Sequence, residues 1–201
     1  MTGSVQQVRA LMEQGCWQDA KQRCRRLVKK SRNDAEALFL LGVIHGRLEE
    51  YEAALDCFQR VLKLSPNVPE AHQNLGLALK ELRRPQEAIC SFRKAVQLKP
   101  DYVAAMLNLG NTCFELGLSG EAIDMFERIT GIDPDHPDLW SALGLAYVME
   151  YRFRESINCF HKALQWRQGD GVLHEELWNN IGMSLNNLGD RDVLGLVAER
   201  P

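Results

Sequence analysis

The stretch that decides the fold is LKLSPNVPEAHQNLGLAL, residues Leu62 to Leu79, read beside VQLKPDYVAAMLNLGNTC, residues Val96 to Cys113. In each stretch an apolar helical pattern ends, a break containing proline follows, and a second helical pattern begins at once. Proline interrupts a helix because it has no amide hydrogen and its ring clashes with the preceding turn. The chain therefore contains the same helix–break–helix pattern twice, 34 residues apart.

The same interval relates five columns of residues along most of the chain. They are a leucine–glycine pair, an alanine, a phenylalanine and a proline. Their positions are Leu41, Leu75, Leu109 and Leu143; Gly42, Gly76, Gly110 and Gly144; Ala54, Ala88 and Ala122, with Ser156 next; Phe58, Phe92, Phe126 and Phe160; and Pro66, Pro100 and Pro134. A fixed period of this size predicts a stacked array of helical units.

Each column has a physical role in a helix–turn–helix hairpin. Glycine on the first helix removes a side chain where the second helix approaches, and phenylalanine on the second helix fills the space beside it. The segments LRRPQEA, residues 82–88, and LGLSGEA, residues 116–122, predict a tight turn between the two helices. Such a hairpin has an apolar face that only a neighbouring hairpin can bury. The side chains expected in the core are Leu75, Phe92, Leu109, Phe126, Leu143 and Phe160.

The period and the columns resemble the tetratricopeptide repeat family. The copy with the best match carries Trp140, Leu143, Gly144, Tyr147, Ser156, Phe160 and Ala163. The resemblance covers Ala35 to about Gln168, and it implies an all-α fold, a right-handed superhelical solenoid of helix–turn–helix hairpins. The Asn-Leu-Gly steps at Asn74 and Asn108 are also similar to the repeats of O-GlcNAc transferases, which present protein substrates to a separate catalytic domain.

The predicted organisation is one continuous domain of successive repeats. Residues 1–34 form a divergent first repeat, with Gln7-Val8 where Leu-Gly is expected. Four clear repeats follow at 35–68, 69–102, 103–136 and 137–170. Residues 171–201 are interpreted as a loop and an incomplete sixth repeat or capping helix, because Trp178, Ile181 and Gly182 regain the spacing only after a four-residue shift. The expected loop is QGDGVL, and DRDVLGLVAER is the short second helix.

Composition excludes several classes of function. The formal net charge is −3, which does not favour nucleic acid or an anionic membrane as a partner. The longest apolar run, about residues 37–44, is too short to cross a bilayer, and the N-terminus does not resemble a signal peptide. Six cysteines lack metal-binding spacing and lie mostly among apolar neighbours, so we interpret them as free thiols in a reducing, cytoplasmic location.

No pattern of residues indicates catalysis, and we expect no catalytic residue, no metal site and no cofactor. The five histidines are scattered, and core positions explain His45 and His72 better than metal binding. The acidic segment LEEYEAA, residues 48–54, is interpreted as a solvated turn. The basic run KQRCRRLVKKSR, residues 21–32, would suit an acidic partner or RNA, although such a run is more often the solvated face of a terminal helix.

The remaining candidate site is the concave groove that the first helices line in this family. The residues expected in it are Phe39, Val43, Gln73, Asn74, Leu77, Lys80, Leu107, Asn108, Asn111, Phe114, Ser141, Leu145, Val148, Asn179, Met183 and Asn186. Its apolar centre predicts a binding surface, and its asparagines suit the main chain of a ligand. The alternatives are that the apolar residues pack against neighbouring hairpins and that the asparagines bond their own helices.

The sequence therefore predicts a non-catalytic protein–protein interaction scaffold that binds a peptide or a helix in its groove. The alternative is a regulatory or substrate-recruiting module of a larger enzyme, such as a glycosyltransferase or a methyltransferase. Self-association through the ends of the solenoid is a third possibility. Some tetratricopeptide domains hold the acidic C-termini of heat-shock chaperones with a clamp of lysine, asparagine and arginine side chains. The corresponding positions here are Phe39, Val43, Ala104 and Asn108, which supply neither the lysine nor the arginine. Binding of chaperone C-termini is therefore not expected.

Overall fold

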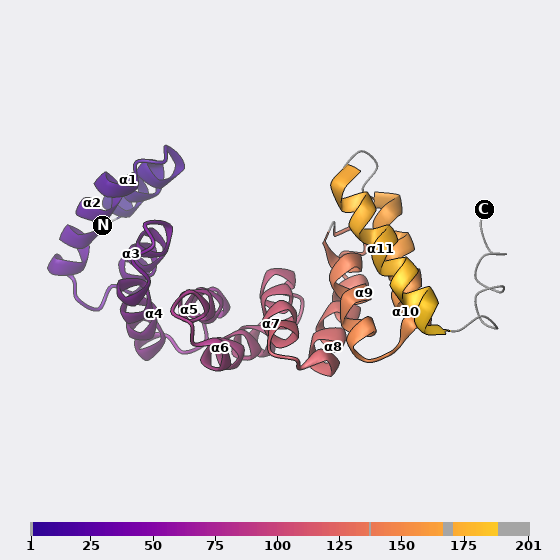
Figure 1. Ribbon diagram of the computed structural model, residues 1–201. Coiled ribbons are helices and arrows are strands. Elements are labelled where there is room, and N and C mark those ends of the chain that lie inside the picture. The colour runs from indigo at the N-terminus through magenta and orange to yellow at the C-terminus, as the bar shows by residue number, and fades with distance from the viewer. Residues whose placement is uncertain (1, 137, 167–170, 189–201) are drawn as a thin grey trace. The chain divides into compact units, whose positions relative to one another are not determined.

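The computed structural model describes residues 2–136, 138–166 and 171–188, and these residues form α-helices joined by short turns, with no strand among them (Figure 1). The predicted all-α fold of helical hairpins is confirmed. The helices are α1 (Thr2–Glu13), α2 (Trp17–Lys30), α3 (Ala35–Arg47), α4 (Tyr51–Leu64), α5 (Pro69–Glu81), α6 (Pro85–Leu98), α7 (Val103–Glu115), α8 (Ser119–Thr130), α9 (Leu139–Met149), α10 (Phe153–Trp166) and α11 (Gly171–Leu188).

The chain divides into two compact units, Met1–Ala105 and Met106–Pro201. In the first unit, α1 packs against α2, α3 against α4 and α5 against α6, which makes three hairpins. Contacts of α2 with α3 and of α4 with α5 join these hairpins, and α3 also touches α1 and α5. In the second unit, α9 packs against α8, α10 and α11. Within each unit, these helices thus pack against their neighbours in sequence.

The turns inside the hairpins share a left-handed backbone residue that recurs every 34 residues. The φ angles are 72° at Gly15, 59° at Glu49, 59° at Arg83, 75° at Gly117 and 59° at Tyr151. Glycine adopts this conformation without a steric penalty, whereas the other three side chains do not. The turn geometry is therefore conserved between hairpins even where the sequence lacks the residue that favours it.

Close packing of a glycine against a phenylalanine holds the two helices of each central hairpin together. A Cβ atom added to Gly42 would lie 2.7 Å from the ring of Phe58, and one added to Gly76 would lie 2.5 Å from the ring of Phe92. The same pairing joins Gly110 to Phe126 and Gly144 to Phe160. All four phenylalanines are buried. The predicted roles of these two columns are confirmed.

The first hairpin solves the same packing problem with different residues. Val8 and Cys24 occupy the positions 34 residues before Gly42 and Phe58, and both are fully buried. The larger side chain now lies on the first helix and the smaller one on the second. Burial raises the pKa of Cys24 to about 12, which marks its thiol as a packing group and not a nucleophile.

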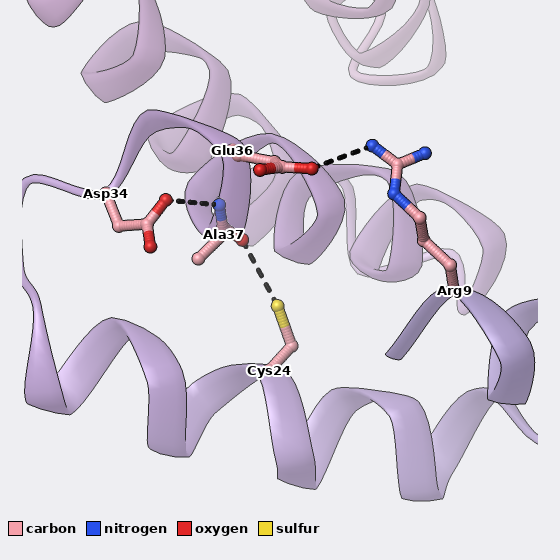
Figure 2. A network of polar contacts seen from close by, with 5 residues as sticks. All are labelled: Arg9, Cys24, Asp34, Glu36 and Ala37. Atoms are coloured by element: carbon pink, nitrogen blue, oxygen red, sulfur yellow. Dashed lines mark hydrogen bonds and ion pairs between the residues drawn. The ribbon is translucent and has the colours of Figure 1, made fainter. Parts of the chain in front are cut away.

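Polar contacts connect the first hairpin to the start of α3 (Figure 2). The side chain of Asp34 caps α3 by accepting a 3.0 Å hydrogen bond from the amide of Ala37. The thiol of Cys24 donates to the carbonyl oxygen of Ala37 at 3.1 Å, and Arg9 forms a 3.0 Å ion pair with Glu36. These contacts tie α1 and α2 to the helix that follows them.

Two expectations differ from the structure. Leu75 is partly exposed, because it packs on the edge of the cluster of Ala54, Phe58 and Ala78 and is not enclosed by it. The other five predicted core residues are buried. Helix α11 begins at Gly171, so the expected loop QGDGVL does not extend beyond residue 170. The segment DRDVLGLVAER lies outside the described residues.

Candidate functional site

The residues predicted to line the groove lie on the first helices of the hairpins, and none of them is buried. In the first unit, all six keep partial exposure: Phe39, Val43, Gln73, Asn74, Leu77 and Lys80. In the second unit, Leu107, Asn108, Phe114, Ser141 and Val148 are partly exposed, and Asn111, Leu145, Asn179, Met183 and Asn186 are exposed. The first helices therefore present side chains from which a binding surface can be built.

A pocket of about 430 Å³ opens on this face of the first unit, between α3, α4 and α5. Its floor is formed by Ala54, Phe58 and Ala78, which are buried in one apolar cluster. Its walls include Val43 and Leu77. The pocket thus combines an apolar interior with an open mouth, the usual form of a site that receives an apolar side chain.

The sequence identified three residues of the pocket and missed others. Val43, Asn74 and Leu77 were predicted, while Gly46, Arg47, Tyr51 and Glu81 also line the pocket. The helical period could have identified Gly46 and Glu81, because Gly46 lies three residues after Val43 and Glu81 lies four residues after Leu77. These pairs share a helix face.

Some of the polar side chains at the pocket already interact with other groups of the protein. The side-chain amide of Asn74 donates a 2.8 Å hydrogen bond to the carbonyl oxygen of Glu70 in its own helix. The guanidinium of Arg47 lies 5.9 Å from the centre of the Trp17 ring. Burial, followed by the nearby carboxylates of Glu81 and Glu49, raises the pKa of Tyr51, so its phenol is a hydrogen-bonding group at neutral pH.

Next to the pocket, a buried histidine joins three helices through a carboxylate. His45 is only 3% exposed, and its Nδ1 donates to Oε2 of Glu50 at the start of α4. The other oxygen of Glu50 accepts a 2.5 Å hydrogen bond from Lys21 of α2. Burial lowers the pKa of His45, although the bond to Glu50 acts in the opposite sense, and Arg25 and Lys21 lower it further.

We expect the stability of the protein to fall as the pH drops below the usual histidine pKa of 6.5. Because the pKa is lower in the folded state, the unfolded chain binds the His45 proton first, and acid therefore favours unfolding. The pKa of Glu50 is also lowered, by its bonds to Lys21 and His45, which adds a loss in the same direction below 4.5. Thermal unfolding followed by circular dichroism at a series of pH values measures the effect.

The matched control for this prediction is a second histidine of the same unit. His45→Gln should flatten the change in melting temperature between about pH 7.5 and about pH 5.5. His72→Gln, which removes a partly exposed histidine, shows whether that effect is specific to His45. An equal slope in the parent and in His45→Gln would show that another group controls the pH dependence.

The described residues contain no group of three or more His, Cys, Asp or Glu side chains arranged to hold a metal ion. None of the six cysteines, each of which the structure describes, forms a disulfide, and burial raises the pKa values of Cys57 and Cys159 to about 11 and about 12. In the described ranges, no helix has both the length and the apolar character needed to cross a membrane.

Successive hairpins that bury their faces against one another define an α-helical repeat protein. The chain belongs to the tetratricopeptide repeat family: three models of this repeat match residues 35–68, 57–89 and 79–146, which together cover 35–146 without a gap. Domains of this class are in general non-catalytic scaffolds that offer extended surfaces to other proteins.

Solved structures show the same fold. The crystal structure of MamA is 25% identical and has a TM-score of 0.75, with 78% of this chain and 92% of MamA covered. A MamA fragment from Desulfovibrio magneticus RS-1 is 20% identical, with a TM-score of 0.77 and coverage of 85% and 96%. YrrB, described as a tetratricopeptide repeat protein with an unusual peptide-binding site, is 22% identical, with a TM-score of 0.75 and coverage of 86% and 90%. No curated protein sequence matches the chain.

Proposed function

We propose that the protein is a non-catalytic interaction scaffold that binds a peptide or a helix of a partner protein on the groove face of its first helices. The observation that carries this proposal is the pocket between α3, α4 and α5, which has an apolar floor and is open to solvent. YrrB supports the proposal because a protein of the same fold is described with a peptide-binding site.

The pocket suits one large apolar side chain as an anchor. Burying a leucine- or phenylalanine-sized side chain contributes roughly 1.5–3 kcal/mol, and a few such anchors dominate the binding energy of an interface. Around the anchor, the side-chain amide of Gln73 and the oxygen of Asn74 can pair with the main chain of the ligand. The partner segment is therefore defined by a bulky apolar residue and only weakly by its neighbours.

Acidic chaperone tails are not part of this proposal. Phe39 and Val43 lie on α3 as partly exposed apolar side chains, and Ala104 is an exposed methyl group on α7. A carboxylate placed against them would lose water without gaining a cationic partner. We expect a peptide that ends in a chaperone-type acidic tail not to bind in the groove.

Gly46→Phe is expected to block the pocket without disturbing the fold. A Cβ atom added to Gly46 meets no other atom within 4 Å, and Gly46 lines the pocket, so a phenyl ring there competes with the ligand's anchor. Peptides selected from a random displayed library against the parent protein should lose at least about tenfold in affinity, the equivalent of about 1.4 kcal/mol, when titrated into the variant.

Gly46→Ala is the matched control, because its methyl group leaves most of the pocket open. It should bind the selected peptides within about twofold of the parent, while alanine in a helix adds up to about 1 kcal/mol of stability. If peptides bind Gly46→Phe as tightly as the parent, the pocket is not the anchor site and the proposal is wrong in its central claim.

A further inference from the structure

Helix α2 concentrates positive charge in a chain that is acidic overall. Between Trp17 and Lys30 it carries six lysine or arginine side chains and one aspartate, a net charge of +5, whereas the whole chain has a formal net charge of −3. The apolar face of α2, with Ala20 and Cys24, is buried against the first two hairpins. The charges therefore lie on the faces of α2 that these contacts leave uncovered.

Part of this charge has partners and part does not. Lys21 is paired with Glu50, and the guanidinium of Arg23 donates to the side-chain oxygen of Gln7. By contrast, Arg25, Arg26 and Lys29 are exposed, and no acidic side chain in the described part of the chain forms an ion pair with them. Three cations are therefore open to a ligand.

The unpaired cations share a shallow polar hollow of about 530 Å³ with two glutamines. Gln18, Gln22, Arg25, Arg26 and Lys29 line it, with Asp19 near the start of the helix as the only acidic group. We refer to these five residues as the α2 basic face. Residues four apart on a helix are about 6 Å apart along its axis, so the face offers donors in a regular row.

We propose that the α2 basic face binds an acidic segment of a partner protein. Carboxylates recur about every 6.8 Å at alternate residues of an extended peptide, which is close to the spacing of the row, and guanidinium groups bind carboxylates through paired hydrogen bonds. The face belongs to the second helix of the first hairpin, so this site is separate from the pocket on the groove face.

The composition of the face favours a protein segment over other polyanions. It contains no aromatic side chain on which the bases of a single-stranded nucleic acid would stack. It also presents no apolar side chain to enter a membrane interface, because the apolar side of α2 packs inside the unit. The net negative charge of the chain opposes a long polyanion but not a short acidic segment.

The test uses the full chain and a fluorescein-labelled twelve-residue peptide of alternating glutamate and serine. We expect saturable binding in fluorescence anisotropy that weakens when sodium chloride is raised from about 50 to about 200 mM. Arg26→Gln with Lys29→Gln should weaken binding at least about tenfold. The matched control, Lys63→Gln with Lys94→Gln, removes two exposed charges from α4 and α6 and should change binding less than about twofold.

Three comparisons can overturn the proposal. Tighter binding of a twelve-nucleotide single strand, or of phosphatidylserine vesicles, would assign the face to nucleic acid or membrane. Equal losses of peptide affinity in the α2 variant and in the control would indicate general electrostatic attraction and no specific site on α2. No binding of the parent to the peptide at low salt would also reject it. Gly46→Phe should bind the peptide like the parent, which separates this site from the groove pocket.

Discussion

Phe126→Ala is expected to lower the free energy of unfolding by about 3–5 kcal/mol, the usual cost of truncating a fully buried phenylalanine. Phe126 is completely buried, and its ring packs directly against the backbone of Gly110. Removing the ring leaves a cavity between α7 and α8 that backbone atoms on both sides cannot readily close. Urea unfolding followed by circular dichroism measures the loss.

Phe114→Ala is the matched control in the same unit. It makes the same chemical change at a side chain that remains partly exposed on α7, so the loss should be about half as large or smaller. Hydrogen exchange of the α8 amides adds a local measurement, because unfolding confined to one unit would be diluted in a global signal. If Phe126→Ala unfolds at the same urea concentration as the parent, the packing between α7 and α8 described above is wrong.

The second large effect is expected from Gly42→Val, because the fold leaves no room for a side chain at that position. Its Cβ atom would lie 2.7 Å from one ring carbon of Phe58 and 2.9 Å from another, closer than real side chains approach. The helices α3 and α4 would have to separate or the ring would have to leave its rotamer, and overpacking of this kind costs about 1–3 kcal/mol. The melting temperature should fall accordingly.

The first hairpin provides the compensating change for a double-mutant cycle. Val8 and Cys24 fill the equivalent positions there, so Phe58→Cys should relieve the clash that Gly42→Val creates. The double variant should be more stable than the sum of the two single losses predicts, by about 2 kcal/mol. Full recovery is not expected, because Phe39 also packs on the edge of Phe58, with ring centres 5.9 Å apart. If the two losses of stability simply add, a smaller side chain at position 58 does not make room for a larger one at position 42, and the expected compensation is absent.

Most of the core was predictable from sequence because its pattern is periodic. Phe92, Leu109, Phe126, Leu143 and Phe160 follow one interval and are buried as expected. Leu75 follows the same interval and is nonetheless partly exposed. A column specifies which face of a helix a residue occupies, but its burial also depends on how far the neighbouring hairpin extends over that face.

The groove pocket was predictable only in part. Exposure of Val43 and Leu77 follows from their helix faces, whereas the hollow between them depends on Gly46, which has no side chain to fill it. Glycine has no side chain, so the pattern of apolar and polar residues does not indicate a hollow at its position. The hydrogen bond from the Asn74 side-chain amide to the carbonyl oxygen of Glu70 likewise depends on the side-chain rotamer, which the residue type does not determine.

The amino-acid sequence alone specified the repeat interval, the all-α class and the pairing of glycine with phenylalanine, because these depend on contacts within one hairpin, at short range along the chain. The pocket, the open charges of α2 and the left-handed turns at Glu49, Arg83 and Tyr151 required the folded chain. The pocket arises where two successive hairpins meet, and the turns arise where the backbone imposes a conformation that the local residue does not favour. The charges of α2 stay open because its apolar face is the one that packs against the other helices. Packing between hairpins determines the pocket, and a single repeat does not contain that information.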